Sequence, residues 1–493
     1  MTSVTVQAIV DALREAGLLA GTRGALPTHV TVLTDDSRAV NADALFVAVR
    51  GAERDGHDYL DGAARRGATV AMVDDASRTG LPAIIVRDTR RAASVAAAAF
   101  HGFPARALRL VGVTGTNGKT TTVGMLRHLL DAPDARAASI GTLGVLLGSE
   151  GEALPGGGGL TTPGPVELQR VLRQLVDAGV RTVAMETSSH ALHQHRADTL
   201  QFAAAVFTNL TRDHLDYHGT MEAYFAAKAT LIGLLTGDGA AVTNADDPAW
   251  NALPPAPRRV RFGRSTKADV RAEQLRFAPR GSCWRLVADG EEHDVALPLI
   301  GDFNVDNALA AAAASWSLGL PLAHIAKRLR MMPQVPGRLE ILSEHPVVLR
   351  DYAHTPDALE RALAAVRPFA TRRLIVVFGC GGDRDRGKRP EMGRIAQHGA
   401  DLAIVTSDNP RTEDPERILD DIEAGMTAGA HERIEDRRSA IARAVALAGE
   451  GDVVMLAGKG HETYQVRGTV KHPFDEREIV GEILRERVAK ETD

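Results

Sequence analysis

The stretch that decides the fold is Val111-Gly-Val-Thr-Gly-Thr-Asn-Gly-Lys-Thr-Thr-Thr122. An apolar run at residues 108–113 enters a glycine-rich turn, which ends in Lys119 and Thr120 and opens an apolar helical pattern. Backbone N–H groups of such a turn can point into one concavity at a helix N-terminus, where lysine reaches phosphates and threonine holds Mg²⁺. We therefore predict a nucleotide site rather than a plain strand-to-helix turn, although Val113 stands where the strict Walker spacing has glycine.

Composition limits the class of protein. The chain has 493 residues, enough for about three domains that each bury a core. Aromatic residues make up only 4% and the formal net charge is −5, so stacking surfaces are few and no general phosphate-backbone binder is expected. We expect no nucleic-acid partner, and any polyanionic ligand must be bound by locally placed Lys, Arg and helix ends.

The expected compartment is the cytoplasm. Cys283 and Cys380 cannot build a disulfide framework, which is typical of a reducing environment. Residues 1–17 show the pattern of a polar amphipathic helix without a signal-peptide core, and no apolar run is long enough to span a bilayer. The sequence therefore predicts a protein that is not inserted in a membrane.

Hydrophobic periodicity divides the chain into three α/β units. The first unit alternates short apolar runs with Ala-rich helical stretches and ends near residue 106. The second begins with the glycine-rich turn and ends near residue 336, where the prolines of 331–337 are typical of a linker. The third shows apolar strands alternating with helical patterns, which indicates βαβ repeats and a mostly parallel sheet. The clearest expected strands are 44–49, 69–73, 83–86, 182–185, 204–207, 347–352, 374–378, 402–406 and 453–457, and the clearest expected helices are 92–100, 304–318, 357–366 and 439–448.

Two polar segments follow strands of the second unit. In Met185-Glu-Thr-Ser-Ser-His190, Glu186 could bind a metal and Ser188 a phosphate, while a helix cap by Ser or Thr explains the same residues equally well. Thr208-Asn-Leu-Thr-Arg-Asp-His-Leu-Asp-Tyr-His218 favours a metal or phosphate site, with a satisfied loop histidine as the alternative. Lys228 lies in an apolar helical pattern, and its ordinary interpretation is a surface lysine whose stem covers apolar neighbours.

The third unit carries polar segments at several strand ends. Asp351-Tyr-Ala-His-Thr-Pro356 follows one strand, and Gly379-Cys-Gly-Gly-Asp-Arg-Asp-Arg-Gly-Lys388 follows another without fitting a dinucleotide fingerprint. Asp408-Asn-Pro-Arg411 and Gly458-Lys-Gly-His-Glu462 follow two more. Charged loops that only face solvent would have no reason to recur at the ends of several strands. We therefore predict a pocket for an anionic substrate at the sheet edge where these strand ends meet.

These segments occur in the order found in the Mur ligases, the ATP-dependent amide-forming enzymes of peptidoglycan precursor synthesis. The chain resembles this family over essentially its whole length, and the family itself uses the shorter turn without the first Walker glycine. The resemblance rests on Gly115-Thr-Asn-Gly-Lys-Thr120, Glu186-Thr-Ser-Ser-His190, 209–218, Phe303-Asn-Val-Asp-Asn307, Gly337-Arg338 and Asp351-Tyr-Ala-His354. Within the family, Thr161-Thr-Pro163, Gln194-His-Arg196 and Asp408-Asn-Pro-Arg411 make the chain similar to members that add meso-2,6-diaminopimelate to UDP-N-acetylmuramoyl-L-alanyl-D-glutamate.

The resemblance implies the fold class and the nucleotide site. It implies an α/β protein with a small UDP-substrate-binding domain at 1–106, a central P-loop-type ATPase domain with a mostly parallel sheet at 107–336, and a C-terminal Rossmann-like domain at 337–493 that binds the incoming amino acid. We expect it to act as a monomer. The implied ATP-binding residues are Gly115, Thr116, Asn117, Gly118, Lys119, Thr120, Thr121, Asn304, Asn307, Arg338 and Asp351.

Metal, substrate and amino-acid residues are implied in the same way. Thr120, Glu186 and His214 match the family's Mg²⁺ environment, and Lys228 matches the lysine that the family carbamylates, which reverses its interpretation as a surface lysine. The catalytic set is then Lys119, Glu186, His214 and Lys228. Residues implied around the UDP-linked substrate are Ser37, Thr161, Thr162, Ser188, Gln194 and Arg196, with the stretch 52–54. Residues implied around diaminopimelate are Arg384, Asp408, Asn409, Pro410, Arg411, Gly458 and Glu462.

Two other functions remain open. A ligase similar to folylpolyglutamate synthetase would share the ATP chemistry, but it does not account for Thr161-Thr-Pro163 together with Asp408-Asn-Pro-Arg411. A nucleotide-dependent switch or binding module would hydrolyse ATP without forming an amide. An amide ligase of the Mur family would release ADP only with a UDP-linked substrate and an amino acid. This dependence separates it from the two other functions.

Overall fold

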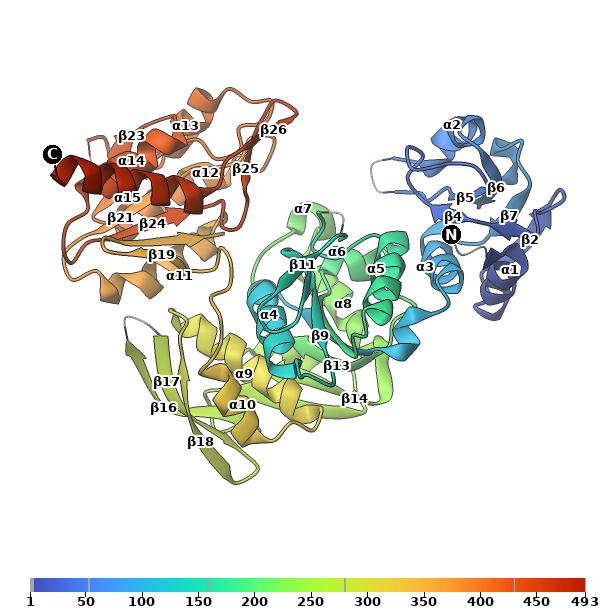
Figure 1. Cartoon of the computed structure of the whole chain (residues 1–493), viewed down its shortest axis with the longest axis horizontal. Coiled ribbons are helices and arrows are strands. Elements are labelled where there is room, and N and C mark those ends of the chain that lie inside the picture. Colours follow the sequence, from blue (N-terminus) through green and yellow to red (C-terminus); the bar gives the residue numbers. More distant parts are fainter. Residues whose placement is uncertain (1–3, 52–53, 158, 279–280, 430, 493) are drawn as a thin grey trace. The chain divides into compact units, whose positions relative to one another are not determined.

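The structure is a computed structural model of the whole chain (Figure 1), and it describes residues 4–51, 54–157, 159–278, 281–429 and 431–492. The chain folds into two compact units. The first comprises Met1–Ala272, Val287–Glu292 and Asp306–Arg328, and the second comprises Glu273–Leu286, His293–Val305 and Leu329–Asp493. None of the helices in the described part of the chain is long and apolar enough to cross a membrane.

The first unit begins with a five-stranded sheet of order β2-β7-β6-β5-β4. Strands β4 to β7 pair in parallel, and β2 runs antiparallel to β7 at the edge. Asp88 starts α3, because its carboxylate accepts hydrogen bonds from the N–H groups of Arg90 and Arg91. The elements are α1 (Val6–Glu15), β2 (Leu19–Arg23), β4 (Val32–Thr34), β5 (Ala44–Val47), α2 (Leu60–Arg65), β6 (Ala68–Val73), β7 (Ala83–Val86) and α3 (Thr89–Phe100), with a separate pair of β1 (Val4–Thr5) and β3 (His29–Val30).

A larger sheet follows, and it carries the glycine-rich turn. Its order is β11-β10-β9-β12-β8-β13-β14-β15, then β16, β17 and β18, and the boundary between the two units passes through the last three strands. The six strands from β9 to β15 in this order pair in parallel, as predicted. The strands are β8 (Arg109–Thr114), β9 (Ala137–Gly141), β10 (Gly144–Leu147), β11 (Glu152–Leu154), β12 (Thr182–Glu186), β13 (Phe202–Phe207), β14 (Leu235–Asn244), β15 (Arg258–Gly263), β16 (Val270–Ala278), β17 (Gly281–Ala288) and β18 (Glu291–Leu297).

The strand β8 lies inside this sheet because its residues are apolar and small. It pairs with β12 on one side and β13 on the other, and from Leu110 onward all its residues are buried. A side chain at Gly112 would come within 3.0 Å of the Phe202 ring, so this position packs closely against β13. The helices that follow are α4 (Lys119–Leu130), α5 (Pro165–Asp177), α6 (Ser189–His193), α7 (Leu215–His218), α8 (Met221–Ala229), α9 (Asp302–Ser317) and α10 (Leu322–Leu329).

The C-terminal part, orange to red in Figure 1, is a sheet of order β19-β20-β24-β21-β22-β23. All its pairs are parallel except β19 with β20. Alternate residues of β21 lie in two core clusters: Val376 and Phe378 pack with residues of α11 and α12, while Ile375 and Val377 pack with residues of α14 and α15. Both faces of the sheet are therefore covered by helices, which explains its near-continuous apolar strands.

The bounds of this part agree closely with the predicted strands. Strands β21 and β24 coincide with the predicted 374–378 and 453–457, and β20 and β22 are one residue shorter than predicted. The elements are β19 (Glu340–Glu344), β20 (Val347–Asp351), α11 (Pro356–Val366), β21 (Leu374–Phe378), α12 (Lys388–Gly399), β22 (Leu402–Val405), α13 (Pro415–Glu423), β23 (His431–Arg433), α14 (Arg437–Leu447), β24 (Val453–Ala457), β25 (Tyr464–Arg467), β26 (Val470–Pro473) and α15 (Glu476–Thr492). The hairpin of β25 and β26 was not predicted, and neither were β1 to β4, β9 to β11, β14 to β19 and β23.

We expect the ion pair of Arg437 and Glu476 to stabilise the C-terminal fold. Both side chains are fully buried, and the Arg437 guanidinium donates to Glu476 Oε1 at 2.8 Å and to the Ala457 carbonyl at 2.9 Å. Glu476→Gln leaves a buried guanidinium without its counter-charge and should cost about 3 kcal/mol of unfolding free energy. The double variant Arg437→Met, Glu476→Leu should cost less. Urea denaturation followed by circular dichroism measures both, and a wild-type midpoint for Glu476→Gln would contradict this role.

Candidate active site

The glycine-rich turn between β8 and α4 has a backbone and close contacts that favour glycine. Gly118 is the N-cap of α4 with φ of +84°, and Gly115 has φ of +148°. A Cβ at Gly115 would lie 1.9 Å from Thr208 Oγ1, and one at Gly118 would lie 2.2 Å from Asn307 Oδ1. The turn therefore stays narrow and places backbone at the positive end of the α4 dipole, which suits an anionic phosphate.

The segment after β13 holds this turn in place. Thr116 N donates to the Asn209 carbonyl at 2.8 Å, and Asn117 N donates to Asn209 Oδ1 at 2.9 Å. In return, Thr208 Oγ1 donates to the Asn117 carbonyl at 2.7 Å. Thr208 and Asn209 thus have a structural role at the predicted site that the sequence did not reveal, although they lie in the segment predicted to bind metal or phosphate.

Two lysines meet at one carbonyl oxygen of the turn. Lys119 Nζ donates to the Gly115 carbonyl at 3.0 Å and to the Thr116 carbonyl at 2.7 Å, and Lys228 Nζ donates to the Gly115 carbonyl at 2.8 Å. Lys228 is 1% exposed and lies over the Tyr224 ring of its own helix at 4.3 Å. The interpretation of Lys228 as a surface lysine is therefore wrong, because its side chain points from α8 into the glycine-rich turn.

Burial changes the chemistry of Lys228. Desolvation, and then the charge of Lys119, hold the pKa of the Lys228 ammonium well below its usual range. An amine of lowered pKa is uncharged over more of the physiological pH range and is then a nucleophile. The charge of Lys119, which binds the same carbonyl oxygen, also favours an anion beside it.

Glu186 ends β12 next to the turn. Its carboxylate accepts a hydrogen bond from Thr142 N at 2.8 Å, and it is 1% exposed. Ser188 caps α6 by accepting from Ala191 N, so the capping interpretation is correct for this residue. The Ser188 hydroxyl also accepts from Thr162 Oγ1 at 3.2 Å, which links Ser188 to the other residues predicted around the UDP-linked substrate.

The residues predicted around the UDP-linked substrate form one hydrogen-bonded group, with one exception. Arg196 donates to the Thr162 carbonyl at 2.8 Å and to Gln194 Oε1 at 2.6 Å, and Thr161 Oγ1 accepts from Thr142 Oγ1 at 3.3 Å. Ser37 lies after β4 in the N-terminal sheet, and no hydrogen bond in the described part of the chain joins it to this group. Of the predicted stretch 52–54, residues 52 and 53 lie outside the described residues.

His214 belongs to a cluster of rings beside the turn. The His190 ring lies 4.8 Å from that of His214, 4.2 Å from that of Tyr217 and 5.4 Å from that of His218, measured between centroids. Burial lowers the pKa of His190 to about 4, with His214 as the next cause, and burial also lowers the pKa of His214. Both imidazoles are therefore neutral at pH 7, the form that can bind a metal ion.

Three buried hydroxyls around the turn are left for an oxygen-rich ligand. The buried hydroxyls of Thr114, Thr187 and Thr211 have no hydrogen-bond partner in the part of the chain that the structure describes. They follow or end the adjacent strands β8, β12 and β13, so three unsatisfied polar atoms gather at one sheet edge. Among the same residues, no group of three or more His, Cys, Asp and Glu side chains could hold a metal. The predicted set contains only Glu186 and His214 of these types, beside Thr120 and Lys228.

The ATP-binding residues predicted outside the glycine-rich turn are Asn304, Asn307, Arg338 and Asp351, and the structure describes all four. Asn304 is 1% exposed and donates to the Ile300 carbonyl at 2.7 Å, and Asn307 Oδ1 accepts from Thr122 Oγ1 at 3.4 Å. Asp351 is also buried, and its carboxylate accepts from Leu339 N and Ala353 N, both at 2.8 Å. Burial raises the pKa of Asp351, and the positive charge of Arg338 partly offsets this.

The residues predicted around diaminopimelate come together at neighbouring strand ends. Strands β24, β21 and β22 are adjacent in the sheet, and they lead into Gly458, Gly379 and Asp408. Asn409 Nδ2 donates to Glu462 Oε2 at 2.9 Å, and a Cβ at Gly458 would lie 2.5 Å from Asp408 Oδ2. The expectation that these strand ends share one edge is confirmed.

The two arginines flank one glycine of this edge. A Cβ at Gly381 would lie 2.8 Å from Arg411 Nη1 and 3.7 Å from Arg384 Cγ. Arg411 has a left-handed φ of +53°, and its N–H donates to the Val466 carbonyl of β25 at 3.0 Å. The unpredicted hairpin therefore sets the backbone of the residue after Pro410.

Sequence reasoning gave no role here to three further charged residues, Arg389, Glu413 and Lys459. Arg389 is fully buried and pairs with Glu413 at 2.9 Å, and it also donates to the Gly381 carbonyl at 3.3 Å. The Arg389 guanidinium lowers the pKa of Glu413 to about 2, so this pair persists at neutral pH and joins the two loops. Lys459 is also fully buried and lies between Asn409 and Glu462. The sequence signal that could have identified Lys459 is its position between two glycines at the end of a strand.

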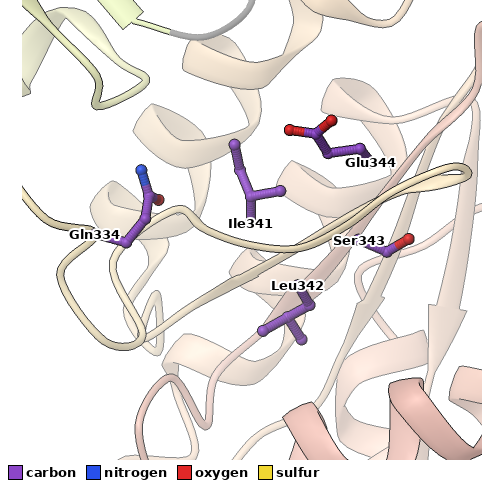
Figure 2. A pocket seen from close by; sticks show the side chains of 5 residues that line it. All are labelled: Gln334, Ile341, Leu342, Ser343 and Glu344. Atoms are coloured by element: carbon purple, nitrogen blue, oxygen red, sulfur yellow. The ribbon is translucent and has the colours of Figure 1, made fainter.

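One hollow of about 390 Å³ lies elsewhere on the second unit. Figure 2 shows that it is lined by Gln334 of the linker and by four residues of β19, namely Ile341, Leu342, Ser343 and Glu344. None of the predicted site residues lines it, so it has no part in the arrangement above.

Comparison with known proteins agrees with the resemblance. Three models of Mur ligase domains match the chain: the Mur ligase family catalytic domain at residues 29–106, the Mur ligase middle domain at 113–315 and the glutamate ligase domain at 337–460. The UDP-N-acetylmuramoyl-L-alanyl-D-glutamate–2,6-diaminopimelate ligase of Geobacillus kaustophilus is 45% identical, over 93% of this chain and 95% of its own. That of Geobacter metallireducens is 46% identical over 95% and 96%. A solved structure of a ligase with this name is 32% identical, with a TM-score of 0.67 over 99% of this chain and 100% of that one. The predicted three-domain α/β architecture is confirmed.

We expect Gly118→Ala to weaken nucleotide binding at least about tenfold, because the new Cβ meets Asn307 Oδ1 and the backbone keeps a positive φ. The control is Gly124→Ala on the same helix, where a Cβ would have no atom within 4 Å. This control should bind ATP as the wild type does and should be slightly more stable. Calorimetric titration with ATP measures both, and equal affinities of the two variants would contradict the strict glycine requirement.

Proposed function

The chain belongs to the Mur ligase family, and on this premise we propose that it joins meso-2,6-diaminopimelate to UDP-N-acetylmuramoyl-L-alanyl-D-glutamate with hydrolysis of ATP to ADP, in peptidoglycan precursor synthesis. The arrangement of Arg411, Asn409 and Glu462 carries this assignment. A guanidinium and a carboxylate at one strand-end edge can bind a ligand end that bears both a carboxylate and an ammonium. The identity with diaminopimelate ligases over nearly the whole chain supports the same substrate.

The reaction needs ATP because a carboxylate is a poor electrophile at neutral pH. The side-chain carboxylate of D-glutamate attacks the γ-phosphorus of ATP, which gives an acyl phosphate and ADP. An amino group of diaminopimelate then attacks the acyl carbon, the amide bond forms, and phosphate leaves with loss of a proton. Lys119 would offset the charge that gathers on the transferred phosphoryl group, so this part of the catalysis would be electrostatic. The hydrogen bonds of its ammonium to the glycine-rich turn support this role.

We infer that the remaining nucleotide and metal residues act as the resemblance implies. Gly115 to Thr121 would surround the phosphates, Asn304 and Asn307 would lie near the adenine, and Arg338 with Asp351 would meet the nucleotide from the third domain. Thr120, Glu186, His214 and carbamylated Lys228 would hold Mg²⁺, which supplies positive charge to the phosphoryl oxygens.

We propose that Lys228 is carbamylated, and its environment supports this. The uncharged amine adds to the carbon of CO₂, so that an N–C bond forms and one proton is released to solvent. The product is an anion in place of a cation beside Lys119, which removes the repulsion between the two side chains at the Gly115 carbonyl. The lowered pKa of Lys228 and its burial support this proposal.

Further parts of the assignment extend this proposal. Ser37, Thr161, Thr162, Ser188, Gln194 and Arg196 would bind the UDP-linked substrate, and Arg384, Asp408, Asn409, Pro410, Arg411, Gly458 and Glu462 would bind diaminopimelate. The domains would be 1–106, 107–336 and 337–493, with the linker at 331–337 as the hinge of a closing third domain that excludes water. We also propose that the protein works as a cytoplasmic monomer, because one chain supplies all the residues named.

The two alternative functions are testable against this one. A ligase similar to folylpolyglutamate synthetase would not require a UDP-linked substrate, and a nucleotide switch would release ADP without any amino acid. The decisive assay follows ADP release with the UDP-muramoyl dipeptide and a panel of amino acids.

In that assay we expect meso-2,6-diaminopimelate to be used and L-lysine to be poorer by roughly a hundredfold, because lysine leaves the Arg411 guanidinium without a carboxylate. Arg411→Ala should raise the KM for diaminopimelate far more than the KM for ATP. The exposed Arg417 of α13 offers the control Arg417→Ala, which should behave as the wild type. Equal use of lysine and diaminopimelate by the wild-type enzyme would refute this role of Arg411.

For Lys228, we expect Lys228→Arg to lower kcat about a hundredfold, because a guanidinium keeps the positive charge and cannot form a carbamate. The wild-type protein supplied with ¹³C-bicarbonate should show a carbamate carbon resonance that this variant lacks. Lys267→Arg, at an exposed lysine, is the control and should keep both the rate and the resonance. Full activity of Lys228→Arg would show that no carbamate is needed.

A further inference from the structure

Lys459 is a buried charge beside the amino-acid site that the reaction described above does not use. Its side chain is fully buried in the loop after β24, between Gly458 and Gly460. The ammonium donates to Asn409 Oδ1 at 3.2 Å and to Glu462 Oε2 at 3.3 Å. A buried lysine is costly unless it is paired, so this position needs a reason beyond packing.

The hydrogen bonds of Lys459 orient two residues of the amino-acid site. Glu462 Oε2 accepts from Lys459 and also from Asn409 Nδ2 at 2.9 Å. Asn409 Oδ1 accepts from Lys459 and from Val466 N at 2.9 Å, which fixes which way the amide group faces. Within the part of the chain that the structure describes, Glu462 Oε1 has no hydrogen-bond partner. One oxygen of the carboxylate is thus held, and the other remains for a ligand ammonium.

Lys459 also changes the charge balance of the site. Among the residues predicted around diaminopimelate, Arg411 and Arg384 together with Lys459 make three cations against the two carboxylates of Asp408 and Glu462. A ligand end with both an ammonium and a carboxylate adds no net charge to this set. An end with only an ammonium, as in L-lysine, adds a fourth cation near a buried ammonium, where electrostatic interactions are strong.

We propose that Lys459 is a positioning and specificity-determining residue of the amino-acid site. Its buried ammonium orients Glu462 and Asn409 toward the ligand, and its charge makes the site reject a ligand end that carries an ammonium without a carboxylate. This inference rests on the proposed use of diaminopimelate, and it adds a repulsive element to the attraction that Arg411 supplies.

The test compares wild type, Lys459→Met and Lys459→Gln for diaminopimelate, L-lysine and ATP, in the ADP-release assay with the UDP-muramoyl dipeptide. We expect Lys459→Met to raise the KM for diaminopimelate about tenfold and to lower the ratio of kcat/KM for diaminopimelate over lysine about tenfold. The KM for ATP should stay within about twofold, because Lys459 acts on the amino acid alone. Lys471→Met, at an exposed lysine of β26, removes a nearby charge and should leave all these constants unchanged.

A double-mutant cycle separates positioning from a general structural role. If Lys459 acts through Glu462, then Lys459→Met should change the KM for diaminopimelate by less than about twofold when Glu462→Gln is already present. Independent effects that multiply would overturn the positioning role, and so would a parallel rise in the KM for ATP.

Two outcomes distinguish failure of this inference from failure of the proposed function. A wild-type enzyme that does not use diaminopimelate would refute the proposed function itself. A wild-type enzyme that does use it, with an unchanged selectivity ratio in Lys459→Met, would refute only the role of Lys459. If Lys459→Met does not fold, Lys459→Gln decides the matter, because glutamine keeps a hydrogen-bond donor without the charge. An unchanged selectivity ratio in that variant would overturn the proposal.

Discussion

The close approach of the glycine-rich turn to the segment after β13 is the constraint on which the rest of the site depends. Gly115 leaves no space for a side chain against Thr208, and hydrogen bonds in both directions join the turn to this segment. This contact requires β8 and β13 to be neighbours, and the parallel pairing of β8 with β12 then brings the end of β12 to the same edge. Glu186 and the unsatisfied threonine hydroxyls gather there for that reason.

In the C-terminal part, too, the pairing of parallel strands brings distant loops to one sheet edge, but these loops carry different side chains. Parallel strands end together, so the loops after β24, β21 and β22 share an edge although they are far apart in sequence. Buried ion pairs then fix these loops: Arg389 with Glu413 joins the two arginine-bearing loops, and Lys459 with Glu462 orients the acidic side. The charged side chains of this region therefore hold the loops in position, in addition to their proposed role in binding the amino acid.

The most apolar parallel strands were predicted, while the hairpins and other parallel strands, such as β9 and β14, were not. Continuous apolar runs such as β21 and β24 are buried on both faces and stand out from their surroundings. Strands such as β16 and β26 expose much of their length, and their charged residues make them similar to loops in sequence. The missed hairpin of β25 and β26 matters for the site, because it holds the backbone of Arg411 and the side chain of Asn409 by hydrogen bonds.

By itself the sequence determined the α/β class, the glycine-rich turn, the family and the residues at strand ends, because these depend on local periodicity and on short motifs. Only the tertiary structure decided which charged side chains are buried and what they contact. Lys228 is interpreted locally as a surface lysine, yet it is buried against Gly115, which lies 113 positions away in the chain. Lys459 is likewise defined by Asn409, 50 positions away. The burial of a charge depends on partners that folding brings together, and no local pattern contains that information.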